Sequence, residues 1–163
     1  MYDSILVPLD GSRRAEAVLP YATDLAKRYE AKVVLMRVVP AFYQIWRETV
    51  PGVVDIAPSG AEAGVEIAQR EVRNRARAAR RYLSGVRTRL INAGVSEVHT
   101  VTAQGDAGAE IVRYAREGQM GLVAIATHGR SGLARAVMGS VADRVIRQAP
   151  GPVLVIRSGK AKS

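Results

Sequence analysis

Residues 121–140 (GLVAIATHGRSGLARAVMGS) constrain the fold more than any other part of this chain. Residues 122–126 are an unbroken apolar run, which is typical of a parallel strand covered on both faces. Gly129 and Gly132 follow closely, and helical spacing begins at Val141. Free N–H groups and the helix dipole converge where a glycine loop meets a helix N-terminus, and they attract anions. The segment predicts a nucleotide-phosphate site; the alternative is that the glycines serve only as turn residues.

Strand-like and helix-like segments alternate along the rest of the chain. Strands are expected at residues 4–9, 31–39, 97–103, 121–127 and 152–157. Helices are expected after Ser12, which can cap the first one, and at about 61–92, 107–117 and 141–148. Pro20 lies inside the first helical pattern and predicts a kink or a local break. The alternation predicts an α/β domain with a parallel sheet, whose ligand crevice lies at the carboxyl ends of the strands.

The chain has 163 residues, which is enough for one domain with a proper core. We assign this domain to residues 1–158, with a long loop at 41–60, a long arginine-rich helix at 61–93 and a basic tail at 159–163. The sequence has no cysteine and no run long enough to span a membrane. Residues 1–10 already have a strand pattern and carry no targeting signal. A cytoplasmic location without membrane attachment is therefore expected.

Basic residues outnumber acidic ones, with 24 Lys and Arg against 15 Asp and Glu, so anionic partners are favoured. A stripe of arginines follows the long helix: Arg70, Arg73, Arg75, Arg77, Arg80, Arg81, Arg87 and Arg89. One interpretation is a solvated helix face, and the other is a patch for nucleic acid or an acidic protein. No nucleic-acid motif accompanies the stripe, so nucleic-acid binding is the less favoured hypothesis.

Two blocks are specific in combination, Gly-Arg-Ser-Gly at 129–132 and Gly-Ser-Val-Ala-Asp-Arg-Val at 139–145. With ILVPLDGS at 5–12 and PVLVI at 152–156, they make the chain resemble the universal stress protein family over essentially its full length. The resemblance implies a flavodoxin-like (Rossmann-like) open parallel sheet of five strands in the order 3-2-1-4-5, with helices on both faces. It also implies a homodimer paired through the strand from Pro152 to Ile156, and an ATP site.

The ATP-binding branch of that family carries the pattern Gly-x2-Gly-x9-Gly-Ser/Thr, to which this chain is similar at Gly129, Gly139 and Ser140. The first glycine position holds Ala126. The free-energy cost of the alanine methyl is small if φ of Ala126 is negative, and about 1 kcal/mol or more if that φ is positive. By resemblance, ribose and phosphates would be held by Ala126, Thr127, His128, Gly129, Arg130, Ser131, Gly132, Gly139, Ser140, Val141 and Ala142. Adenine would be held or lined by Pro8, Leu9, Asp10 and Val38.

Several of these residues also have a plain structural interpretation. Asp10 can accept in an Asx-turn, Ser140 and Asp143 spell a capping box, and Arg130 and His128 can be ordinary loop residues. No residue is an evident activator of water, and a divalent ion such as Mg²⁺ or Mn²⁺ would be held only by the phosphates. The sequence predicts a dimeric ATP-binding regulator with an unknown protein partner and at most slow hydrolysis. A nucleotide-free interaction module and a basic nucleic-acid-binding protein are the alternatives.

Overall fold

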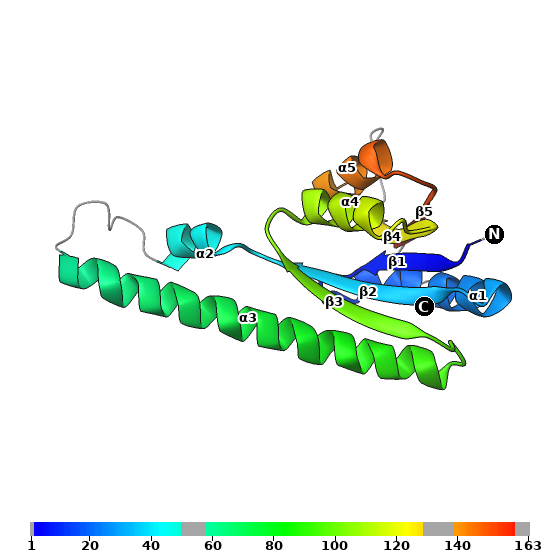
Figure 1. Cartoon of the computed structure of the whole chain (residues 1–163), viewed down its shortest axis with the longest axis horizontal. Coiled ribbons are helices and arrows are strands. Elements are labelled where there is room, and N and C mark those ends of the chain that lie inside the picture. The colour runs from blue at the N-terminus through cyan, green and yellow to red at the C-terminus, as the bar shows by residue number, and fades with distance from the viewer. Residues whose placement is uncertain (1, 50–57, 129–138, 159–163) are drawn as a thin grey trace.

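The computed structural model describes residues 2–49, 58–128 and 139–158, and it contains a five-stranded parallel sheet with helices on both faces (Figure 1). The strands are β1 (Ser4–Pro8), β2 (Lys32–Val39), β3 (Val98–Gln104), β4 (Leu122–His128) and β5 (Val153–Ser158). They lie in the order β3-β2-β1-β4-β5, which confirms the order implied by the resemblance. Every expected strand is present, with boundaries within a residue of those expected from the apolar runs.

The position of β1 at the centre of the sheet explains why its sequence is mostly apolar. All five of its residues are buried, because β2 and β4 flank it and helices cover both faces. Ile5 and Val7 belong to the core formed with α1 (Leu19–Tyr29) and α3 (Pro58–Asn92). Leu6 belongs to the core formed with α4 (Ala107–Glu117) and α5 (Ser140–Gln148). Successive residues of one strand therefore supply two separate cores.

The first helical segment is broken as Pro20 predicts. A 3-10 turn, η1 (Ala15–Val18), precedes α1, and Pro20 lies in the first turn of α1, where its missing N–H costs no hydrogen bond. The Ser12 hydroxyl accepts from the N–H of Ala15, the first residue of η1, at 3.1 Å, although the N-cap residues of η1 and α1 are Arg14 and Val18. The chain leaves the carboxyl end of β1 along a short loop and returns along α1.

The expectation of a loop over residues 41–60 is wrong at both ends of that stretch. Residues Phe42–Thr49 form a helix, α2, and α3 begins at Pro58, before the expected start at about 61. The Gln44 side-chain oxygen accepts from the Ala41 N–H at 2.8 Å, which is the reciprocal half of a capping box. The Phe42 and Trp46 rings lie one turn apart, with centroids separated by 6.0 Å. Two prolines nearby and a short apolar stripe obscured this helix in the sequence.

The long helix α3 ends where Gly94 predicts, because Gly94 adopts a φ of +92° just after Asn92. Its second half packs on β3 and β2 through the buried residues Ala79, Leu83 and Val86, while its first half extends beyond the sheet beside α2 (Figure 1). In the part of the chain that the structure describes, no helix is both long and apolar enough to cross a membrane.

Candidate functional site

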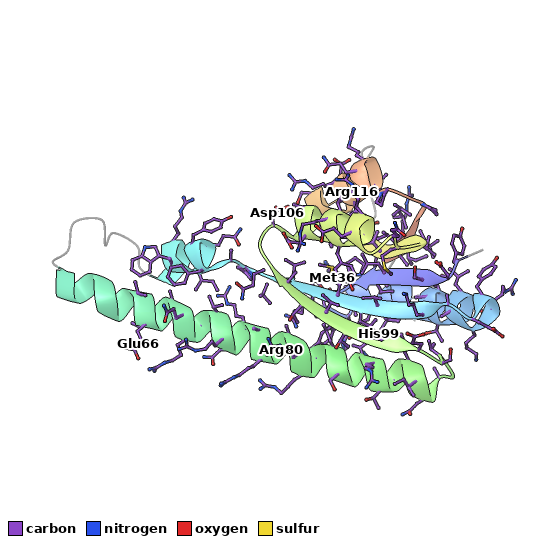
Figure 2. All side chains as sticks on the ribbon, viewed as in Figure 1. Met36, Glu66, Arg80, His99, Asp106 and Arg116 are labelled. Atoms are coloured by element: carbon purple, nitrogen blue, oxygen red, sulfur yellow. The ribbon has the colours of Figure 1, made fainter. Side chains whose placement is uncertain are left out.

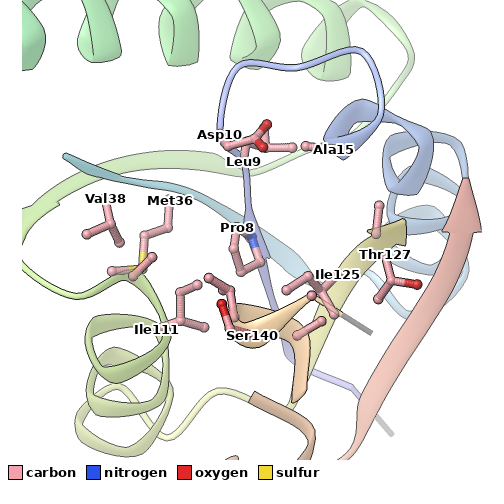
Figure 3. Close-up of a pocket in the computed structure, with 15 residues that line it drawn as sticks. Pro8, Leu9, Asp10, Ala15, Met36, Val38, Ile111, Ile125, Thr127 and Ser140 are labelled. Atoms are coloured by element: carbon pink, nitrogen blue, oxygen red, sulfur yellow. The ribbon is translucent and has the colours of Figure 1, made fainter. Parts of the chain in front are cut away.

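A cavity of about 270 Å³ lies at the carboxyl ends of β1, β2 and β4, beside α4 and the beginning of α5 (Figure 3). This is the point where the strand order reverses, since β1 is followed by β2 on one side and flanked by β4 on the other. The lining residues are Pro8, Leu9, Asp10, Ala15, Met36, Val38, Ala107, Ile111, Ile125, Ala126, Thr127, Gly139, Ser140, Val141 and Ala142. The parallel sheet and its helices therefore bring five distant segments to one place.

The wall of the cavity next to α4 is apolar. Met36 and Val38 come from alternate positions of β2, and Ile111 comes from the first turns of α4. Figure 3 shows these three side chains on the same side of the cavity, with Pro8 beside them. Met36 and Ile111 are buried, so the packing of the second core holds this wall in place. An apolar slot bordered by a few polar groups is typical of sites for small organic ligands.

Asp10 lies at the edge of the cavity across from Ser140 (Figure 3). Its Oδ1 accepts from the Ser12 N–H at 2.8 Å, so the expected Asx-turn is present, and Gly11 supports the turn with a φ of +88°. A carboxylate has two oxygens and several lone pairs, and Oδ2 takes no part in this bond. The structural role of Asp10 thus leaves acceptor capacity that faces the cavity mouth.

The capping box expected at Ser140 and Asp143 is wrong. Gly139 is the N-cap of α5, with φ −58° and ψ 148°, so Ser140 is already the first helical residue. The Asp143 N–H donates to the Gly139 carbonyl at 3.0 Å, and the Asp143 carboxylate binds Arg147 instead. Among the described residues no side chain caps this helix. The first N–H groups of α5 therefore point from the cavity wall with the positive end of the helix dipole.

Ala126, the departure from the glycine pattern, has ordinary strand geometry. It lies in β4, opposite Ile156 of β5. Among the described residues other than glycine, only Glu30 and Gln119 have a positive φ. The case in which Ala126 strains the backbone is therefore excluded. Its methyl packs beside the core formed with α1 and α3.

A cluster of polar side chains lies on the other side of the β1–η1 loop from the cavity. Tyr82 of α3 donates to Glu16 at 2.9 Å, and Arg89 pairs with the same carboxylate at 2.9 Å. Arg37 of β2 stacks over the Tyr82 ring at 5.2 Å and lies against Gly11. Burial and, to a smaller extent, the bond to Glu16 raise the pKa of the Tyr82 hydroxyl above its ordinary range. This cluster fastens η1 and the Asp10 loop to α3.

The structure places most of the expected site residues around the cavity. Pro8, Leu9, Asp10, Val38, Ala126, Thr127, Gly139, Ser140, Val141 and Ala142 line it. His128 is the last residue of β4, and Gly129, Arg130, Ser131 and Gly132 lie outside the described residues. Sequence reasoning missed Ala15, Met36, Ala107, Ile111 and Ile125. The signal for Met36 was present, because it shares a strand face with Val38.

Comparison with known proteins places the fold in a known family. A model of the Universal stress protein family matches residues 1–157. Universal stress protein MJ0531 of Methanocaldococcus jannaschii is 31% identical over 163 residues, covering 98% of this chain and 85% of that protein. The structure of MJ0577 from the same organism is 23% identical, with a TM-score of 0.76 and 99% of each chain covered.

Two further structures of the same fold contain adenine nucleotides. A universal stress protein in complex with cAMP is 18% identical, with a TM-score of 0.65, covering 97% of this chain and 98% of that one. The universal stress protein from Archaeoglobus fulgidus in complex with dAMP is 23% identical, with a TM-score of 0.58, covering 95% of this chain and 98% of that one.

Proposed function

This chain belongs to the universal stress protein family, and we propose that it binds ATP in the cavity between β1, β2, β4 and α5 and acts as a nucleotide-dependent regulator. The observation that carries the proposal is the arrangement of an apolar slot between the Asp10 carboxylate and the uncapped N-terminus of α5. The parts of a nucleotide match these features: a flat base suits the apolar slot, a ribose with hydroxyl donors suits the carboxylate, and the anionic phosphates suit the helix N-terminus.

The adenine ring would lie against Met36, Val38 and Ile111. Met36 and Ile111 are buried, Val38 is half-buried, and all three are apolar, so a flat aromatic ring gains free energy by leaving water to lie against them. Asp10 would accept a hydrogen bond from a ribose hydroxyl or the adenine amino group through the oxygen that the Asx-turn does not use. Fold relatives with bound cAMP and dAMP support an adenine nucleotide as the ligand class.

The phosphates would lie at the beginning of α5. Its first N–H groups and its dipole favour a negative charge there, and the Ser140 hydroxyl can donate as well. By their position in the family pattern, Gly129, Arg130, Ser131 and Gly132 are proposed to contact the ribose and phosphates, together with His128. A divalent cation such as Mg²⁺ or Mn²⁺ would be held by phosphate oxygens. Among the described residues no group of three or more His, Cys, Asp or Glu could hold a metal ion.

We further propose a cytoplasmic homodimer paired through β5, with a protein partner whose choice depends on nucleotide occupancy. β5 lies at an edge of the sheet, beyond β4, and its residues Val153–Ile156 are half-buried and apolar. A bare apolar edge strand favours pairing with a second copy across a twofold axis.

Acid extraction of the freshly purified protein, followed by mass spectrometry, tests the nucleotide directly. We expect ATP in a substantial fraction of the protein, and saturable ATP binding by calorimetry after the nucleotide is removed. GTP serves as the matched ligand control, because it has the same phosphates and a base whose 6-position is a carbonyl. Absence of any extracted nucleotide, together with no heat at millimolar ATP, would contradict the proposal and favour a nucleotide-free interaction module.

A further inference from the structure

Four exposed arginines form a row on α3, which we call the arginine ridge: Arg73, Arg77, Arg80 and Arg81. Arg77 is four residues from Arg73, three from Arg80 and four from Arg81, so the four side chains lie on one broad face of the helix. A different face of α3 carries the buried residues Leu83, Val86 and Leu90, which pack against the sheet. Figure 2 shows long side chains standing off this stretch of α3, where Arg80 is labelled, on the side away from the sheet.

Within the described part of the chain, the four ridge arginines have no carboxylate partner, and what distinguishes them from other unpaired arginines such as Arg28 and Arg116 is that they are grouped on one helix. Several other helical arginines are paired with carboxylates, as Arg70 is with Glu66, Arg113 with Glu110 and Glu117, and Arg147 with Asp143. On α3 the last acidic residue is Glu71, and seven arginines follow it before the helix ends at Asn92: Arg73, Arg75, Arg77, Arg80, Arg81, Arg87 and Arg89.

This arrangement works against the stability of the helix. Arg73 and Arg77, Arg77 and Arg80, and Arg77 and Arg81 are like charges at helical spacing, which repel one another on a helix surface. Nothing in the packing of α3 requires arginine at exposed positions, because Gln or Lys–Glu pairs would fill them equally well. A cost to folding without a packing benefit indicates a role in binding an anionic partner.

We propose that the arginine ridge binds the phosphate backbone of double-stranded nucleic acid without reading its base sequence. The guanidinium group is suited to bidentate contact with phosphate oxygens. At about 1.5 Å per helical residue, Arg73 and Arg81 are roughly 12 Å apart along α3. A duplex carries one negative charge per about 1.7 Å of its axis, so it meets every charge of the ridge at once.

The surroundings of the ridge favour this partner over a protein or a membrane. Interfacial membrane helices bury an apolar face, and protein interfaces commonly add aromatic or apolar anchors to their arginines. The large exposed apolar residues on α3 are Val65, Ile67 and Ile91, and none lies within the ridge. Small or polar residues lie between its arginines, among them Asn74 and Ala78. Base stacking is also disfavoured, because Tyr82 is half-buried with its hydroxyl bonded to Glu16.

The ridge lies away from both other sites. α3 packs against β3 and β2 at one edge of the sheet, whereas β5 forms the other edge (Figure 1). None of the ridge residues lines the cavity. A dimer through β5 would leave two ridges open, and the inference holds whether or not the cavity binds ATP.

Fluorescence anisotropy with a labelled 20-base-pair DNA duplex tests the proposal on the full-length protein. The test variant replaces four arginines with Gln: Arg73→Gln, Arg77→Gln, Arg80→Gln and Arg81→Gln. The matched control removes the same charge from exposed positions on other helices: Arg28→Gln, Arg113→Gln, Arg116→Gln and Arg147→Gln. Circular dichroism and ATP calorimetry on both variants verify that folding and the cavity are unaffected.

For four phosphate contacts we expect log K to fall with log salt with a slope of about −3.6, an affinity loss of about 100-fold between 50 and 200 mM salt. The ridge variant should lose about 30-fold or more in affinity at 50 mM salt, with a slope near zero, while the control stays within about fivefold. A second duplex of unrelated sequence should bind equally well.

Three results would overturn the proposal. Equal losses in the ridge and control variants would mean that net charge alone attracts DNA. Tighter binding of polyglutamate than of the duplex would assign the ridge to an acidic protein. Binding to phosphatidylserine vesicles that depends on the ridge, with none to the duplex, would assign it to a membrane surface.

Discussion

The cavity at the sheet edge and the arginine ridge on α3 are built in opposite ways. The cavity takes its residues from β1, β2, α4, β4 and α5, which are far apart in the sequence. The ridge takes all of its residues from one continuous helix. A site assembled by tertiary packing holds a small number of different groups, each at a defined position, so it can select a ligand by shape. A site on one helix supplies charge at regular intervals, so it suits a repetitive polyanion.

The comparison also predicts how each site responds to mutation. A single added or removed group in the cavity changes a defined contact, whereas the ridge shares its binding energy over several similar charges. One substitution in the cavity should therefore be enough to lower ligand affinity strongly. At the ridge, each substitution should lower affinity slightly, and the losses should add up.

The largest expected effect is that of Gly139→Val on ATP binding. The backbone of Gly139 is compatible with valine, since φ is −58° and ψ is 148°, but the side chain would enter the space in front of the α5 N–H groups. We expect ATP affinity to fall by about 100-fold or more, equivalent to about 2.7 kcal/mol. Calorimetry measures the loss, and DNA binding through the ridge should be unchanged.

Gly151→Val is the matched control for that experiment. It adds the same side chain just after α5, where a Cβ would have ordinary contact with the Met120 carbonyl at 3.7 Å. ATP affinity should stay within about twofold of the wild type. If Gly139→Val binds ATP as well as this control does, the beginning of α5 is not the phosphate site.

Val155→Lys should shift the protein from dimer to monomer. Val155 lies in the edge strand β5, so a lysine there disfavours apolar pairing along the edge. Because Val155 also packs beside the core formed with α4 and α5, circular dichroism must first show that the variant is folded. Light scattering should give about 35 kDa for the wild type, twice the 17.5 kDa chain, and a monomer mass for the variant.

Val155→Thr keeps the β-branched shape and adds no charge, so this control variant should remain dimeric. A wild type that is monomeric at micromolar concentration would contradict the dimer. A lysine variant that remains dimeric would place the interface away from β5. Neither outcome bears on the proposals for the cavity and the ridge, because each of those sites lies within one chain.

Asp10→Asn separates the two roles of Asp10. Asparagine keeps an oxygen that can accept from the Ser12 N–H, so the turn persists, but the ligand loses a charged acceptor. We expect ATP affinity to fall about tenfold, which is about 1.4 kcal/mol, with little change in the thermal unfolding midpoint. Asp10→Ala should lower both affinity and stability. Unchanged affinity in the asparagine variant would restrict Asp10 to its structural role.

Ala126→Gly should have the smallest effect. Because the Ala126 backbone is an ordinary strand, glycine relieves no strain there, and we expect ATP affinity within about twofold of the wild type. The added backbone freedom should lower stability by about 0.5–1 kcal/mol, measured by thermal or urea unfolding. A gain in affinity of about tenfold would mean instead that the methyl crowds the ligand.

The local pattern of the sequence was sufficient for most of the fold. Apolar runs identified all five strands, Gly94 marked the end of α3, and Pro20 marked the break before α1. Helix α2 was missed because its signal, a glutamine that bonds back to the Ala41 N–H, is short and surrounded by prolines. The helix start was misplaced by one residue, because Ser140 and Gly139 are both acceptable N-caps and the helix begins after the glycine.

The candidate site was only partly predictable. Pro8, Leu9 and Asp10 follow from the position of a strand end, but Ile111 depends on how α4 packs against β2. Helical periodicity places Ile111 on an apolar face without indicating which cavity that face borders.

Secondary structure, the unusual charge of α3 and the helix ends are determined by the sequence, because each depends on residues within a turn or two of one another. The meeting of Met36, Ile111 and Asp10 around one cavity, and the separation of that cavity from the ridge, were decided by the tertiary structure. Strand order sets which distant segments become neighbours, and it depends on long-range packing that no short window of sequence contains.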